Sequence, residues 1–257
     1  MSNNPFDLSG RVALVTGGNS GIGLGIARAL AAAGADIAVW GTNAGKNEAA
    51  VDELSVGGSR AMSAVCDVGD PDQVAAAFAE TVAALGKVDV AVANAGIGGS
   101  GTRFVDIPYE EWRRVLAVNL DGVFTTFQHA ARDMIDRGSG GSLIAVSSII
   151  GTQVATGAVQ PYAASKAAID GLVRSAAVEL GRWQIRVNSI RPGWVHTPLA
   201  ASQLDDPGFA ERSMKRLAIR RWGTPADIGG AAVYLASDAS KYHTGDDLAI
   251  DGGYPLG

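Results

Sequence analysis

The sequence predicts an α/β fold in which a parallel sheet of about seven strands carries helices on both faces. Short apolar runs recur along the chain, separated by stretches with helical periodicity. Most of these runs are continuously apolar, as expected for strands that are covered on both sides. Repeated strand–helix–strand units favour a doubly wound sheet with right-handed crossovers.

The individual elements follow from these patterns. The expected strands are Val12–Thr16, Ile37–Trp40, Ala61–Cys66, Val88–Ala93, Leu143–Ser147, Ile185–Ile190 and Leu248–Ile250. The expected helices are Gly21–Ala33, Gly45–Leu54, Pro71–Leu85, Tyr109–Arg137, Pro161–Arg182 and Pro225–Ala236. The last helix has a clear start, because Thr224 supplies a capping hydroxyl and Pro225 suits the first helical position. No linker, repeat or charge block divides the chain, so we expect residues 1–257 to form one domain.

Composition excludes several classes of protein. The 257 residues are 47% hydrophobic and 18% charged, which indicates a packed globule rather than a disordered chain. A net charge of -5 argues against a general nucleic-acid binder. The single cysteine, Cys66, excludes an intrachain disulfide and suits a reducing compartment. No signal peptide or membrane span is visible, so we expect a cytoplasmic protein without nucleic-acid or membrane partners.

A glycine-rich turn follows the first expected strand and opens the first expected helix. Its spacing is G-x-x-x-G-x-G. Glycines permit a tight turn and let the backbone approach a pyrophosphate, which then lies at the helix N-terminus. A plain strand-to-helix turn is the alternative. We therefore predict a dinucleotide site that includes Gly17, Asn19, Ser20, Gly21, Ile22 and Gly23.

The end of the second strand bears on the choice of dinucleotide. An NAD-selective fold usually places Asp or Glu there to bind the ribose 2'-hydroxyl, but this chain has Gly41. No carboxylate repels a 2'-phosphate, and no arginine follows to pair with it. Asn19, Thr42, Asn43 and Lys46 offer donors instead. We therefore favour NADP(H) as the cofactor and keep NAD(H) as the alternative.

Two more strand ends complete the predicted nucleotide site. Asp67, followed by Val68, comes after the third strand and can accept a hydrogen bond from an adenine amino group. Its alternative is a solvated carboxylate. Asn94, Ala95 and Gly96 form a small-residue turn after the fourth strand, at the edge where α/β folds bind ligands.

The most informative motif is the run from Tyr162 to Lys166, in an expected helix. The Y-x-x-x-K spacing places a phenol and an ammonium on one helical face, one turn apart. Alone it is weak, because chance produces it often. Together with the glycine turn and with Ser147 and Ser148 at a strand end, it predicts a nicotinamide-dependent oxidoreductase with a tyrosine acid/base.

Seven motifs in this order resemble the short-chain dehydrogenase/reductase family, from about Leu8 to Tyr254. They are Thr16–Gly23, Asn94-Ala95-Gly96, Asn119, Ser148, Tyr162 with Lys166, Pro192-Gly193 and Asp251-Gly252-Gly253. The resemblance implies a Rossmann domain and a homotetramer built on the expected helices Tyr109–Arg137 and Pro161–Arg182. Apolar residues on more than one face of these helices agree with a buried contact.

The resemblance also implies the roles of four residues. Tyr162 would be the proton donor to a developing alkoxide, and Ser148, rather than its neighbour Ser147, would polarise the carbonyl. Lys166 would lower the pKa of the phenol and hold the nicotinamide ribose. Asn119 would anchor a water chain that leads to the lysine.

Residues after the sixth strand complete the prediction. Pro192, Gly193 and Val195 would shape the turn under the nicotinamide, and Thr197 would bind its carboxamide. Residues 194–222, rich in large apolar side chains, are expected to form a lid that excludes water from hydride transfer. The histidines stand far apart in the sequence, so no metal site is expected.

The expected reaction is hydride transfer between a nicotinamide cofactor and a ketone or secondary alcohol. A ketoreductase resembling 3-oxoacyl reductases is the first expectation, with a small-molecule substrate. A sugar, polyol or cyclic-alcohol dehydrogenase that uses NAD is the alternative. Members of this family that bind a carrier protein tend to have basic residues on two neighbouring helices. Here Arg132 lies on one of them, but the corresponding turn of the other holds Val178. Epimerases and dehydratases of this nucleotide fold fit less well, because they are usually longer and have a larger C-terminal substrate domain. Cofactor-sensing proteins also fit less well, because they can lose the tyrosine or the lysine, and this chain keeps both.

Overall fold

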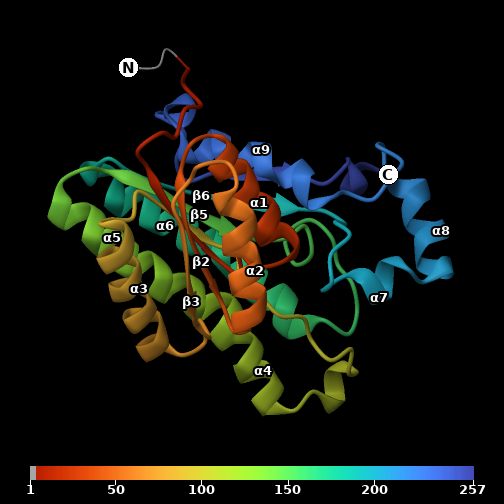
Figure 1. Cartoon of the computed structure of the whole chain (residues 1–257). Helices are drawn as coiled ribbons and strands as arrows, with labels where there is room; N and C mark the ends of the chain where they lie inside the picture. The colour runs from red at the N-terminus through yellow and green to blue at the C-terminus, as the bar shows by residue number, and fades with distance from the viewer. Residues whose placement is uncertain (1–3) are drawn as a thin grey trace.

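Seven parallel strands form one sheet between two layers of helices in the computed structural model, which describes residues 4–257 (Figure 1). The strand order is β3-β2-β1-β4-β5-β6-β7. The chain builds outward from β1 to β3 and then returns to place β4 beside β1. The predicted doubly wound sheet is therefore confirmed, and its strand order reverses between β1 and β4.

The elements lie close to their expected positions. The strands are β1 Val12–Thr16, β2 Asp36–Gly41, β3 Ala61–Val65, β4 Val90–Ala93, β5 Gly141–Val146, β6 Ile185–Pro192 and β7 Asp247–Ile250. The helices are α1 Gly21–Ala32, α2 Ala44–Ser55, α3 Pro71–Leu85, α4 Tyr109–Leu116, α5 Gly122–Arg137, α6 Gln160–Leu180, α7 Ala201–Leu204, α8 Pro207–Arg216 and α9 Pro225–Ala236. Within residues 4–257, no helix is both long and apolar enough to cross a bilayer.

The five inner strands β2, β1, β4, β5 and β6 bury side chains on both faces, which explains their largely apolar sequences, whereas the edge strands β3 and β7 are only partly buried. In β1, Val12 and Leu14 join the hydrophobic cluster under α3, α5 and α6. Ala13 and Val15 join the opposite cluster, under α1, α2 and α9. Successive side chains of a strand point to opposite faces, so a strand covered on both sides cannot carry an exposed polar face.

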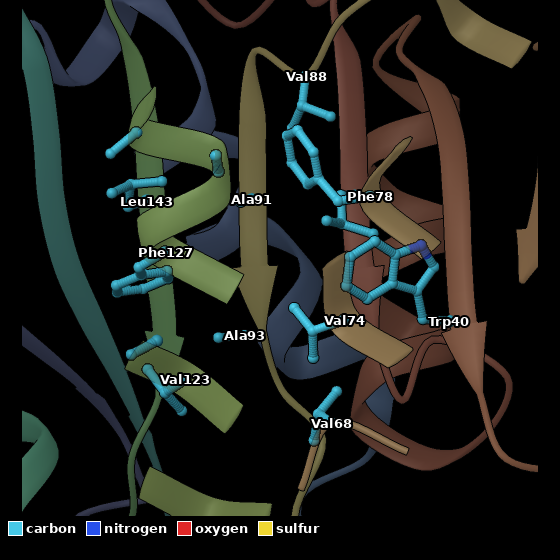
Figure 2. Close-up of a cluster of buried hydrophobic side chains, with 14 of the residues drawn as sticks. Trp40, Val68, Val74, Phe78, Val88, Ala91, Ala93, Val123, Phe127 and Leu143 are labelled. Carbon is cyan, nitrogen blue, oxygen red and sulfur yellow. The ribbon is translucent and has the colours of Figure 1, made fainter. Parts of the chain in front are cut away.

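The first of these clusters contains two aromatic rings that contact each other, those of Trp40 and Phe78 (Figure 2). Trp40 from β2 meets Phe78 from α3 edge to face, with the ring centroids 6.5 Å apart. The indole nitrogen of Trp40 is satisfied, because it donates to the Thr81 hydroxyl at 3.0 Å. The large residue at the end of β2 is thus held in place just before Gly41.

One expected helix is interrupted. The sequence predicts a continuous helix over Tyr109–Arg137, but a π-helical turn over Ala117–Asp121 joins α4 to α5. Such a turn carries one extra residue, and here it directs Asn119 into the interior, where its side chain is fully buried. The periodicity on both sides is helical, so the pattern alone did not reveal the insertion.

Helices α1 and α9 pack closely enough to require glycine at their crossing. A Cβ on Gly25 of α1 would lie 2.5 Å from the Pro225 carbonyl oxygen. A Cβ on Gly229 of α9 would lie 2.6 Å from the Cβ of Ala29. The next residue, Gly230, faces open space, because a Cβ added there would meet no heavy atom within 4 Å.

These two neighbouring glycines give opposite stability predictions. Gly229→Ala should lower the free energy of unfolding by about 1–3 kcal/mol, because the added methyl overpacks the helix crossing. Gly230→Ala should leave it unchanged or raise it by about 0.4–1 kcal/mol through reduced unfolded-state entropy. Urea unfolding of both variants measures the difference, and equal effects would contradict the packing argument.

Candidate active site

A cleft of about 230 Å³ opens at the carboxyl ends of the central strands. It brings together most of the residues that the sequence assigned to cofactor and catalysis. The predicted residues that line it are Gly17, Ser20, Gly21, Ile22, Gly23, Asn94, Ala95, Gly96, Ser148, Tyr162, Lys166, Pro192, Gly193, Val195 and Thr197. Segments far apart in the chain therefore meet at the point where the strand order reverses.

The glycine turn is too tight for larger residues. Gly17 has a φ of +62°, and a Cβ on it would lie 2.9 Å from the Asn94 side-chain nitrogen. A Cβ on Gly23 would lie 2.2 Å from the Gly17 carbonyl oxygen. The backbone at Gly21 and Gly23, at the start of α1, is consequently not covered by side chains of its own. The N-terminus of α1 faces the cleft at Gly21 and Ile22. This cradle fits a pyrophosphate, which binds free N–H groups and the positive end of a helix.

Thr16 and Asn94 hold the two sides of this cradle together. The Thr16 hydroxyl accepts from the backbone nitrogens of Asn94 and Ala95, each at 3.0 Å. The Asn94 side chain in turn donates to the carbonyls of Thr16 at 2.9 Å and Gly17 at 3.3 Å. These bonds fix the end of β4 against the glycine turn.

The remaining predicted nucleotide residues lie outside the cleft lining. Thr42 and Asn43 are exposed at the start of α2, where the Asn43 oxygen caps the helix by accepting from Lys46 N at 2.9 Å. Asp67 accepts from Gly69 N at 2.9 Å. Val68 is buried in the core beneath. Contacts of these residues with an adenosine moiety stay predictions.

Helix α6 carries the tyrosine and the lysine on one face, as the spacing requires. The Lys166 Nζ lies 5.7 Å from the centroid of the Tyr162 ring. That nitrogen is buried and donates to the Val146 carbonyl at the end of β5, at 2.7 Å. The bond ties the face of α6 that carries Tyr162 and Lys166 to the sheet beside Ser147 and Ser148.

Burial controls the ionisation of both groups. It lowers the pKa of Lys166 to about 8, because a buried ammonium loses hydration. It also raises the pKa of Tyr162, and the hydrogen bond with Ser148 opposes this only in part. The sequence led us to expect that the lysine would lower the tyrosine pKa. In the structure, burial of the phenol is the larger effect.

The two adjacent serines have different surroundings. Ser147 turns to α6, where its hydroxyl bonds the Lys166 carbonyl and the Asp170 carboxylate, each at 3.1 Å. Ser148 hydrogen-bonds Tyr162, and its hydroxyl accepts from Ile150 N at 3.0 Å. This geometry favours Ser148 as the carbonyl-polarising residue that the sequence predicts.

Asn119 lies behind the cleft wall rather than on it. Its amide bonds both backbone groups of Ile97, accepting from N at 2.8 Å and donating to O at 2.9 Å. It also donates to the Ser165 hydroxyl at 3.1 Å. A Cβ on Gly96 would lie 3.4 Å from the Asn119 side-chain oxygen and 3.5 Å from Lys166 Nζ. The side chains of Asn119 and Lys166 therefore both lie beside Gly96.

A buried ion cluster that contacts α6 was not predicted from the sequence. The Arg191 guanidinium contacts Asp170 of α6 and Asp247 of β7, each at 2.8 Å. Burial and the nearby Asp247 raise the pKa of Asp170, while Arg191 opposes the shift. Two signals were available: a charged residue within an apolar strand, and a carboxylate one helical turn after Lys166.

Residues 194–222 pack into a separate hydrophobic cluster beside the cleft. Trp194 contacts Phe209 of α8 edge to face, with centroids 4.9 Å apart. It also contacts Tyr254, near the C-terminal end of the chain, at 5.9 Å. Figure 1 shows α7 and α8 standing apart from the sheet, with the C-terminus beside α8. Trp194 thus links α8 to the C-terminal residues, and the role of the segment as a lid stays a prediction.

Other reactive groups lie elsewhere. Cys66 is buried, and burial raises the pKa of its thiol to about 11. His196 bonds Asp205 at 3.0 Å on the surface. Within residues 4–257, no three His, Cys, Asp or Glu side chains gather in a way that could hold a metal ion.

Comparison with known proteins gives one family. The family model described as enoyl-(acyl carrier protein) reductase matches residues 17–255. The chain is 39% identical to L-rhamnose 1-dehydrogenase (NAD(P)(+)) of a Sphingomonas species over 248 residues, covering 96% of each protein. It is 38% identical to the sorbose reductase of Candida albicans over 252 residues, covering 97% of this chain and 88% of that one.

Solved structures agree with this result. The crystal structure of a gluconate 5-dehydrogenase from Burkholderia cenocepacia, in complex with NADP and tartrate, is 38% identical. It superimposes with a TM-score of 0.93 over 98% of each chain. The fold, the family model and the full-length similarity thus agree, and the chain belongs to the short-chain dehydrogenase/reductase family.

Proposed function

We propose that this protein is an NADP(H)-dependent oxidoreductase that interconverts a ketone and a secondary alcohol on a small polyhydroxylated molecule. The observation that carries the proposal is the convergence of Ser148, Tyr162 and Lys166 beside the glycine cradle in one cleft. A solved relative contains NADP, which supports the choice of cofactor. NAD(H) is the alternative, since the rhamnose dehydrogenase relative is described for both.

The side chains divide the chemistry among them. A bound nicotinamide cofactor supplies or accepts the hydride. Ser148 donates a hydrogen bond to the substrate carbonyl oxygen, where negative charge develops. Tyr162 gives its proton to that oxygen during reduction and removes it during oxidation. Lys166, charged below its pKa of about 8, stabilises the phenolate left behind.

The cleft wall and the relatives both support a hydroxylated substrate. The names of three relatives refer to sorbose, rhamnose and gluconate. The indole nitrogen of Trp194, which lines the cleft, is buried without a hydrogen-bond partner among the described residues. A buried donor of this kind is costly unless a ligand satisfies it, and a substrate hydroxyl would do so.

A 3-oxoacyl substrate is the second candidate, favoured by the apolar Ile149, Ile150 and Leu199 on the cleft wall. A carrier protein would need basic contacts on both α5 and α6. Arg132 lies on α5, whereas Val178 of α6 is apolar and 86% exposed. The surface therefore favours a free small molecule.

We also propose that the enzyme is a cytoplasmic homotetramer. An apolar groove runs between α5 and α6, and Phe124 on its rim is 48% exposed. Exposed aromatic residues beside an apolar groove are typical of contact surfaces. The buried, reduced Cys66 suits a reducing compartment.

Replacing the tyrosine tests the chemistry. Tyr162→Phe should lower kcat by roughly 10²–10⁴-fold, because the proton donor is removed, while NADPH binding persists. The control is Tyr234→Phe, which removes a hydroxyl that contacts His243 outside the cleft. Steady-state kinetics with a ketose and fluorescence titration measure both effects. Full activity of Tyr162→Phe would refute the assignment.

The rate of carbonyl reduction should fall as the pH rises above about 8. Below that pH, Lys166 keeps its charge and the buried phenol keeps its proton, so both groups are in the form needed to protonate the product. A profile of kcat/KM for reduction between about pH 6 and about pH 10 measures this. A rate that increases through the alkaline range would contradict it.

A charge in the α5–α6 groove should disrupt the oligomer. Phe124→Glu is expected to lower the molar mass in solution, because a carboxylate would be buried without a partner. Val56→Glu is the control, since Val56 is 87% exposed just after α2, far from the groove. Light scattering during gel filtration gives the masses, and an unchanged mass for Phe124→Glu would exclude this face as the interface.

A further inference from the structure

The end of β2 determines how the chain distinguishes a 2'-phosphate from a 2'-hydroxyl, because the ribose of a dinucleotide lies there in Rossmann folds. In this chain that position is Gly41, which is buried and has no side chain. The selecting groups must therefore come from its neighbours. Their role rests on the proposed function, since they belong to the same nucleotide site.

Asn47 of α2 is a buried amide that joins two strand ends. It is 1% exposed, and its nitrogen donates to the Gly41 carbonyl at 2.9 Å and to the Ala64 carbonyl at 3.1 Å. Both hydrogens of the amide are thereby used on β2 and β3. Backbone carbonyls cannot donate, so these bonds fix which way the amide faces. Its oxygen is left to face Asn19.

The orientation of Asn47 dictates that of Asn19. The Asn47 oxygen is an acceptor, so Asn19 must offer its nitrogen, and the two atoms lie 2.6 Å apart. An amide nitrogen carries two hydrogens, and one remains for a ligand. No other hydrogen bond of the Asn19 side chain occurs within residues 4–257.

This nitrogen stands where a selective carboxylate would stand in an NAD site. A Cβ on Gly41 would lie only 2.2 Å from it. An NAD-selective site presents an acceptor for the 2'-hydroxyl proton, whereas this chain presents a donor. A phosphate has acceptor oxygens and carries negative charge. The exposed Lys46 and the N-terminus of α2 add positive potential beside it.

We propose that the Asn19–Asn47 amide pair selects NADP(H) over NAD(H) in this enzyme. Asn19 donates to the 2'-phosphate. Asn47 does not touch the cofactor but acts as a positioning residue, because it fixes the donor side of Asn19 toward the ribose. The pair takes the place of the arginine that the chain lacks after Gly41.

The test is direct binding of NADPH and NADH by fluorescence titration. Asn19→Ala should weaken NADPH by roughly tenfold or more, the value of a hydrogen bond to a charged group, and leave NADH nearly unchanged. Asn19→Asp should go further and reverse the preference, since it exchanges the donor for an acceptor. Asn19 is only partly buried, so both variants leave the core intact.

A double-variant cycle tests the positioning role. Asn47→Leu should also weaken NADPH selectively, and Asn19→Ala with Asn47→Leu should be no worse than Asn19→Ala alone, because Asn47 acts through Asn19. Asn188→Leu is the matched control. That residue is another fully buried amide, bonded to the His243 carbonyl at 2.9 Å and to Asp246 N at 3.2 Å. It should leave the ratio of the two affinities unchanged.

The outcomes separate this inference from the proposed function. Equal losses of NADPH and NADH affinity in Asn19→Ala, or no loss of either, would overturn the selectivity role. An additive double variant would overturn the role of Asn47. A wild-type protein that binds neither dinucleotide would instead overturn the proposed function, and this inference with it.

Discussion

The contact between Thr16 and Asn94 is the constraint on which the site depends. Four hydrogen bonds from these two residues join the ends of β1 and β4, the neighbouring strands between which the chain reverses direction across the sheet. At that point the glycine turn approaches Asn94 so closely that a side chain at Gly17 or Gly23 would collide with it. The shape of the cleft therefore follows from the sheet topology and from these hydrogen bonds.

Catalytic groups are then held on this frame at some cost in hydration. Lys166 is buried, and a single bond to the Val146 carbonyl replaces part of the water it has lost. Its pKa falls toward neutrality as a result, while that of Tyr162 rises. Because the pKa of Tyr162 is raised and that of Lys166 is lowered, the phenol keeps its proton throughout the pH range in which the lysine is charged. A protonated Tyr162 suits the role of proton donor in carbonyl reduction. In the reverse reaction, alcohol oxidation, the charged Lys166 has to favour the phenolate form of Tyr162.

Local sequence patterns predicted the fold and most of the cleft. The features that they missed depend on contacts between residues far apart in the sequence or on a local change in helical geometry. Apolar runs located the inner strands because both of their faces are buried. Short motifs located Tyr162 and the glycines because chemistry restricts their spacing. The π-helical turn at Asn119 escaped, since one inserted residue leaves the helical periodicity on either side intact. Asn47 escaped for a different reason: in the sequence it is one polar residue among several on α2, and only the folded chain shows that Asn19, Gly41 and Ala64 surround it.

The ion cluster of Asp170, Arg191 and Asp247 bears on how the enzyme tolerates concentrated salt. Surface pairs such as Arg28 with Glu53 are about half exposed, so dissolved ions screen them readily. The side chains of the cluster are 9–15% exposed and contact one another at 2.8 Å, where few ions can enter. The attachment of α6 to β6 and β7 is thus insulated from ionic strength. Added salt is therefore expected to weaken the approach of charged ligands to the cleft more than it weakens the attachment of α6 through this cluster.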